Sequence, residues 1–131
     1  MNKTLRNSLV LAAIVAGAVS FVQAQQPGIK RTILQKNDAG ENREVVMAVA
    51  EIAAGGSAGR HTHPGVETGY VLEGSSVVLI DGEAPKQFKA GDSYFIPAGK
   101  VHDAKAEGGN PAKVLAIYVV EKGKPLATPA P

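Results

Sequence analysis

The chain has 131 residues, of which 44% are hydrophobic and none is cysteine. This length suits one domain with one core, and the absence of cysteine excludes a disulfide framework and thiol chemistry. The 14 basic and 12 acidic residues form no basic patch or aromatic-interleaved basic run, which argues against a nucleic-acid partner.

The first 24 residues follow the pattern of a secretory signal peptide. Lys3 and Arg6 give a positive start, residues 9–19 form an apolar run, and Val22 and Ala24 place small residues before a cleavage site. Cleavage after Ala24 predicts an exported protein, periplasmic or secreted, that is not held in the membrane after processing. A membrane anchor is the alternative, but a membrane span requires roughly 20 apolar residues.

The remaining chain is predicted to be a series of β-strands. Short segments bounded by glycine, proline, aspartate or asparagine are found at residues 43–52, 67–74, 76–82, 86–91, 92–99, 101–108 and 112–120. Because no segment after residue 24 has a sustained helical period, we expect an all-β sandwich or barrel, with the apolar segment 112–120 at its centre. Residues 25–32 and the proline-rich end are expected to be loosely held. The chain is thus divided into a signal peptide (1–24), an N-terminal segment (25–42), a β-domain (43–120) and a tail (121–131).

Two of the three histidines, His61 and His63, lie one residue apart, and the third is His102. Residues i and i+2 of a strand point to the same face, so the first two imidazoles are expected to point together. A bend at residues 64–65 returns Glu67 to the same point, and a second bend precedes His102. Three imidazoles and a carboxylate suit first-row metals such as Fe, Mn, Ni, Cu or Zn. The alternative is three unrelated histidines at the surface or in turns.

The spacing around these residues favours the metal site. One pattern consists of Gly55, His61, His63, Glu67 and Gly74, and a second consists of Gly91, Pro97, Gly99 and His102. These two patterns resemble the paired motifs of the cupin superfamily, and the resemblance covers roughly residues 43–120.

The resemblance implies a small single-domain cupin, a jelly-roll β-barrel in which both motifs face the interior. It also implies one divalent transition metal, held by His61, His63, Glu67 and His102. The family often has asparagine four residues after the last histidine, where this chain has Ala106. That asparagine is not a ligand, so the departure concerns local hydrogen bonding. Small cupins are often dimers, and exposed sheet edges would give a reason for a homodimer.

Small residues flank the predicted ligands. Ala104 and Ala106 share a strand face with His102, and Gly69 is the next residue on the face of Glu67. This pattern indicates either a cavity that admits a ligand or the taper of a small barrel. Five residues are candidates for a pocket mouth, although each is more often packing or solvated surface: Arg60, Tyr70, Tyr94, Phe95 and Lys100.

Two functions are consistent with such a site. A metal with open coordination positions takes a substrate and O₂ together, or acts as a Lewis acid, and Glu67 is the candidate catalytic residue as a general base. The first function is therefore a metal-dependent enzyme, dioxygenase-like or related, that acts on a small oxygen-rich or aromatic compound. The second is a non-catalytic protein that binds a metal and a small molecule.

Overall fold

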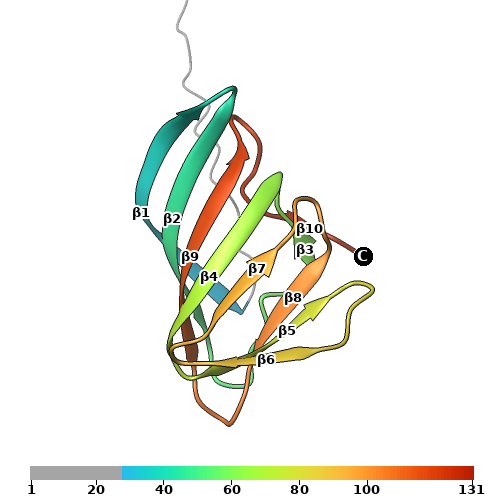
Figure 1. Ribbon diagram of the computed structural model, residues 1–131. Helices are drawn as coiled ribbons and strands as arrows, with labels where there is room; N and C mark the ends of the chain where they lie inside the picture. The colour runs from blue at the N-terminus through green and yellow to red at the C-terminus, as the bar shows by residue number, and fades with distance from the viewer. Residues whose placement is uncertain (1–27) are drawn as a thin grey trace, which may run out of the picture.

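The computed structural model describes residues 28–131, and this part of the chain forms ten β-strands without a helix (Figure 1). The strands are β1 (Ile29–Gly40), β2 (Arg43–Ile52), β3 (His61–Thr62), β4 (Gly65–Glu73), β5 (Ser75–Ile80), β6 (Lys86–Lys89), β7 (Ser93–Ile96), β8 (His102–Ala106), β9 (Ala112–Glu121) and β10 (Thr128–Pro129). The predicted signal peptide lies outside the described residues. No helix in residues 28–131 is long and apolar enough to cross a membrane.

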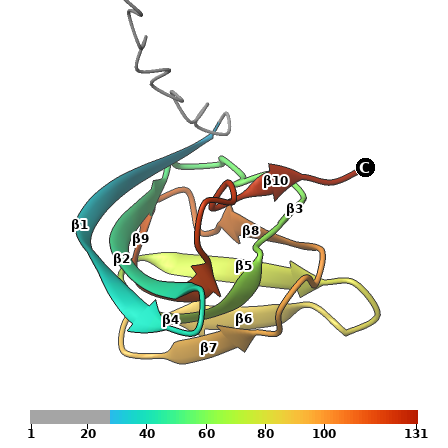
Figure 2. The ribbon, with the colours of Figure 1, turned by 90° about the horizontal axis from the view of Figure 1, so that it is seen from above.

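The strands form two antiparallel five-stranded sheets, in the orders β1-β2-β9-β4-β7 and β10-β3-β8-β5-β6. Seen from above, the strands curve around a common interior (Figure 2). This arrangement confirms the predicted all-β, jelly-roll architecture. The seven strands predicted between residues 43 and 120 are also present, with boundaries that differ by a few residues.

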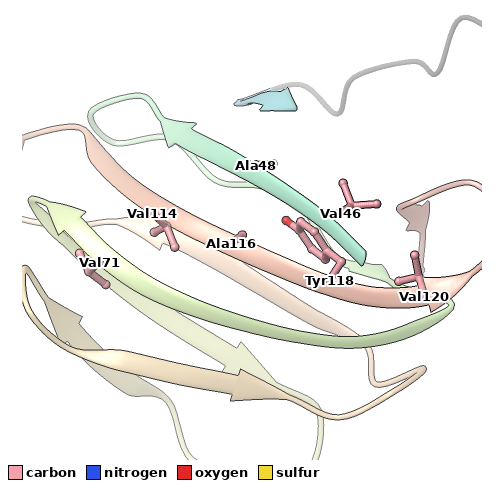
Figure 3. Packing of buried hydrophobic residues seen from close by; sticks show 7 residues of the cluster. All are labelled: Val46, Ala48, Val71, Val114, Ala116, Tyr118 and Val120. Atoms are coloured by element: carbon pink, nitrogen blue, oxygen red, sulfur yellow. The ribbon is translucent and has the colours of Figure 1, made fainter. Parts of the chain in front are cut away.

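The core lies on the inner faces of the two sheets, and β9 contributes most to it. Every second residue of β9 is buried, from Ala112 to Val120, as expected for a strand with one face toward the core. Its inward side chains pack against Val46 and Ala48 of β2 and Val71 of β4 (Figure 3). The prediction that this apolar strand is central is confirmed, because β9 is the middle strand of its sheet.

The expectation that residues 25–32 are loosely held is wrong for Ile29–Thr32. These residues begin β1, which pairs with β2 over its whole length, and Ile29 is buried. The rest of β1 is mostly exposed, and β1 is an edge strand of its sheet. Main-chain pairing with β2, rather than an apolar sequence, holds this strand in place, so hydrophobic pattern alone does not reveal it.

The expectation that the tail is loosely held is also wrong. In β10, Thr128 pairs with Thr62 and Pro129 pairs with His61 of β3, and the main-chain nitrogen of Ala130 donates to the carbonyl of Arg60 at 3.0 Å. Proline is compatible with this position because β10 is an edge strand. The tail therefore lies against the strand that carries the first predicted ligand.

Candidate metal centre

Strand pairing brings the two histidine motifs together. His61 of β3 and His102 of β8 are direct cross-strand partners, with ring centroids 4.3 Å apart. His63 follows β3, and its ring centroid is 4.8 Å from that of His61 and 5.1 Å from that of His102. All three side chains are buried, and their ligand atoms lie within 4.8 Å of one another.

Glu67 reaches this cluster from the opposite sheet, on β4. The chain turns into β4 at Gly65, where a Cβ atom would lie 2.0 Å from the carbonyl oxygen of Val119, so only glycine allows β4 to approach β9 this closely. The Oε2 atom of Glu67 lies 2.9 Å from Nε2 of His63 and 3.4 Å from Nε2 of His102. The structure thus brings together all four residues that the sequence analysis selected.

Main-chain carbonyl groups orient all three imidazoles. The Nδ1 atom of His61 is 2.6 Å from the oxygen of Gly59, that of His63 is 2.6 Å from the oxygen of Leu126, and that of His102 is 2.9 Å from the oxygen of Lys100. Because a carbonyl oxygen only accepts, each Nδ1 donates, and Nε2 of the neutral ring carries a lone pair. Histidines that bind metals are commonly held by such outer hydrogen bonds.

The arrangement of the Nε2 atoms and the Glu67 carboxylate favours a bound cation. Those of His63 and His102 are buried without a hydrogen-bond partner among residues 28–131. Their lone pairs lie beside the Glu67 carboxylate, which is unfavourable unless a positive charge lies between them. Burial lowers the pKa of His61 to about 4, so this ring is in the neutral form that binds metals. The donor set therefore fits a divalent transition metal.

Glu67 is ionised and is held by a tyrosine. Burial by itself raises the pKa of its carboxyl, but hydrogen bonds from the His102 and His63 rings, when these are protonated, outweigh burial and lower the pKa below its ordinary value. A cation bound to the neutral rings would act in the same direction. The hydroxyl of Tyr94 donates to Oε1 of Glu67 at 2.7 Å. Burial, followed by the charge of Glu67, raises the pKa of the Tyr94 hydroxyl, so Tyr94 keeps its proton and remains a donor.

Gly69 makes this contact possible. It is the cross-strand partner of Tyr94, and a Cβ atom at Gly69 would lie 2.3 Å from Cζ of the Tyr94 ring. The ring therefore occupies the space beside Gly69 and carries its hydroxyl to Glu67. The interpretation of Gly69 as room for a ligand is wrong, since an aromatic ring fills that room.

A cavity of about 30 Å³ adjoins His61, His102 and Glu67. Its polar lining is Arg31, His61, Glu67, Ser76, Tyr94, His102 and Tyr118. Ala104 also lines it, so the small residue after His102 does border a cavity, as one interpretation of the pattern predicted. Of the five candidates for a pocket mouth, only Tyr94 lines this cavity. Tyr70 and Phe95 are exposed, and Arg60 pairs with Asp81 at 2.7 Å.

The sequence analysis missed four groups around the site. Arg31 lies in a segment that was expected to be loose, although its alternation with Ile29 is consistent with an inward position. Tyr118 and Ser76 belong to strand faces that alternation predicts to be buried, but nothing in the sequence separates them from ordinary core residues. The fourth group is the main-chain carbonyl of Leu126, which has no sequence signal because any residue supplies a carbonyl.

Comparison with known proteins identifies relatives that share part of their length with this chain. It is 39% identical over 79 residues to germin-like protein subfamily 2 member 2 of Arabidopsis thaliana, and the matched region covers 56% of this chain and 36% of the relative. It is 34% identical over 76 residues to dimethylsulfoniopropionate lyase DddW of Ruegeria pomeroyi, and the matched region covers 58% of this chain and 49% of the relative. The matched regions span less than half of either relative.

A solved structure of recombinant oxalate oxidase in complex with glycolate has the same fold. It superposes with a TM-score of 0.62 at 24% identity, over 78% of this chain and 55% of that chain. A family model described as the cupin domain matches residues 48–118. That region is more than half of the chain and contains all four residues of the candidate metal centre. The chain belongs to the cupin family.

Proposed function

We propose that this protein is a metal-dependent enzyme, of the dioxygenase type or related to it, that acts on a small oxygen-rich or aromatic compound. The observation that carries the proposal is the pair of buried, unpartnered Nε2 atoms of His63 and His102 beside an ionised Glu67. A set of donors held in this way, next to a cavity, is what a catalytic metal requires. The cavity volume of about 30 Å³ favours a small oxygen-rich compound over an aromatic one.

The residues of the site have distinct proposed roles. His61, His63, His102 and Glu67 would hold a divalent ion of Fe, Mn, Cu, Ni or Zn, which supplies Lewis-acid polarisation or, where it is redox-active, electron transfer. Tyr94 orients Glu67 by donating a hydrogen bond to Oε1. When it is displaced from the metal, Glu67 is the proposed catalytic acceptor of a substrate proton. The apolar wall, which includes Ile29, Val78 and Ile96, limits access of water to this atom.

The relatives support an enzyme without fixing its reaction. One curated relative is named as a lyase, and the solved structure is named as an oxidase in complex with a small ligand. A cupin barrel accommodates different chemistries, so these names support the class of site and leave the substrate to be identified by experiment.

A second candidate is a non-catalytic protein that binds a metal and a small molecule. The small volume of the cavity favours it, because a substrate and a co-reactant such as O₂ need more room than a single bound molecule. Turnover distinguishes the two candidates.

The test is to strip the protein with a chelator and refill it separately with Fe(II), Mn(II), Cu(II), Ni(II) and Zn(II). Occupancy, O₂ uptake and CO₂ release are then measured with a panel of phenols and small keto and hydroxy acids. We expect turnover with at least one redox-active ion and little with Zn(II). Equal turnover with Zn(II) would indicate Lewis-acid chemistry. Ligand-induced thermal shifts without turnover would favour the binding protein.

We also propose that the protein is exported, to the periplasm or beyond the cell, after cleavage behind Ala24. Intact-mass measurement of the exported fraction should give a chain that begins at Gln25, whereas a membrane-bound product that keeps residues 1–24 would mean that the apolar run is an anchor.

A homodimer is proposed as well, supported by the exposed Ile33 and Leu34 on the edge strand β1. Light scattering tests it.

A further inference from the structure

Arg31 extends from the edge of the barrel to the metal ligands. It lies on β1 opposite Ala50, which is buried, so its side chain leaves the strand on the inner face. Its guanidinium reaches Nε2 of His61 at 3.3 Å and the hydroxyl of Tyr118 at 3.4 Å. Arg31 also lines the cavity beside the histidines. A permanent positive charge is therefore held at the cavity wall, next to a predicted metal ligand.

The contact between Arg31 and His61 uses the atom that a metal would use. Nδ1 of His61 donates to the carbonyl of Gly59, so Nε2 has one lone pair, which serves either the guanidinium or a metal ion. When a metal takes that lone pair, the donor group of Arg31 becomes available to another acceptor on the same side of the cavity. A ligand bound beside the metal would lie where it can supply this acceptor.

The charges of the site favour an anion as that acceptor. Arg31 contributes one positive charge and a divalent ion two, against the single negative charge of Glu67. Both Glu67 oxygens are already engaged, Oε1 by Tyr94 and Oε2 beside His63 and His102. The carboxylate of Glu67 thus faces the metal and its ligands. With a divalent ion bound, the summed charge of the ion, Arg31 and Glu67 is positive.

A buried hydroxyl gives independent support for a polar ligand in this cavity. Ser76 lies on β5, is 2% exposed, and its Oγ has no hydrogen-bond partner among residues 28–131. It lines the same cavity as Arg31 and His102. Buried hydroxyl groups are normally hydrogen-bonded, so an unpartnered one in a cavity wall is consistent with a group that bonds to a bound molecule.

From these observations we infer that the cavity binds a small organic anion, a carboxylate of a few heavy atoms, and that Arg31 is the residue that selects for its charge. The guanidinium presents a planar fork of donors that matches a carboxylate. The cavity is small, about 30 Å³, which limits the ligand to small molecules. This inference deepens the proposed function and rests on it for the metal, but it concerns binding and is independent of turnover.

The test compares glycolate with glycolamide, which has nearly the same shape but no charge. Binding is followed by calorimetry or thermal shift at constant ionic strength, on chelated protein and on Zn(II)-loaded protein. The variants are Arg31→Gln, Arg31→Lys and, as a matched control, Lys30→Gln. Lys30 is the neighbouring residue of β1, and its side chain is 69% exposed beside Glu51. The control therefore removes the same charge from the same strand but outside the cavity.

We expect wild-type protein and Lys30→Gln to prefer glycolate over glycolamide. Arg31→Gln should weaken glycolate binding by about tenfold or more, because a charge-assisted hydrogen bond is lost, and should leave the affinity for Zn(II) unchanged or raise it. A merely structural role of Arg31 would lower both affinities. Arg31→Lys, which keeps the charge, should retain most of the preference and serves if the glutamine variant does not fold.

Two outcomes would overturn the inference. One is wild-type protein that shows no preference for glycolate in either form, and the other is an Arg31→Gln variant that binds glycolate as tightly as Lys30→Gln does. Failure of wild-type protein to hold Zn(II) would instead contradict the proposed metal site, and with it the release of Arg31 from His61 that this inference requires.

Discussion

His61 and His102 lie directly opposite each other on β3 and β8, with ring centroids 4.3 Å apart. The two sequence motifs are also paired through β4 and β7, where Glu67 lies opposite Ile96. β3 has two residues and pairs with β8 at one position, His61, so strand pairing between the elements that carry His61 and His102 is short. A metal bound by both motifs would connect them and would stabilise the folded state by an amount that grows with metal concentration.

The first prediction concerns these ligands. Replacement of His61, His63 or His102 by alanine should each remove most of the bound metal, since one of the few neutral nitrogen donors is lost. Glu67→Gln should weaken binding less, because an amide oxygen still ligates but carries no charge. Elemental analysis of the purified variants measures the metal content, with Asp81→Asn as a control for loss of an exposed carboxylate. Full occupancy in the His102 variant would contradict the conclusion that both motifs serve one site.

The second prediction concerns Tyr94. Tyr94→Phe keeps the ring over Gly69 but removes the hydroxyl that donates to Glu67. Loss of a hydrogen bond to a buried carboxylate should reduce the free energy of unfolding by about 1.5–3 kcal/mol. Urea denaturation of the metal-free protein measures this value. Tyr70→Phe, which alters an exposed tyrosine, is the matched control and should change stability by less than about 0.5 kcal/mol. Equal stability of both variants would mean that the contact with Glu67 contributes nothing.

The sequence predicts those parts of this fold that depend on local pattern. Alternation of buried and exposed residues identifies strands such as β9, and the spacing of His61, His63 and Glu67 identifies the site. Groups that depend on pairing between distant strands were not predicted. The position of Arg31 follows from the pairing of β1 with β2, and the role of Tyr94 follows from its register opposite Gly69. Neither register is encoded in a short stretch of sequence.

The third prediction concerns pH. Burial lowers the pKa of His61 from 6.5 to about 4. Between these values the unfolded chain binds a proton that the folded chain does not, so the free energy of unfolding falls as pH decreases through this window. The full loss is on the order of 3 kcal/mol. Glu67, whose pKa is held below its ordinary value, adds a further loss at lower pH, where the unfolded carboxyl takes up a proton.

This pH dependence is measured by urea denaturation of the chelated protein at several pH values between 7 and 4. His61→Gln removes the titrating group and should have a flatter profile between pH 6.5 and 4.5, even if its stability at pH 7 is lower. A wild-type stability that stays constant over this range would show that His61 is not held in the neutral form by burial.

The fourth prediction concerns the tail. The carbonyl oxygen of Leu126 accepts the Nδ1 proton of His63 at 2.6 Å, which fixes the tautomer and the orientation of this ligand. Truncation after Lys124 removes that carbonyl and should lower metal affinity by roughly 10- to 100-fold, the range typical for loss of an outer partner of a metal-binding histidine. Truncation after Ala127 is the matched control, since it keeps the Leu126 carbonyl within a peptide bond and removes β10. Competition with a chelator of known affinity measures both constants. If the two truncations weaken binding equally, the pairing of β10 with β3 supports the site, and the carbonyl of Leu126 does not.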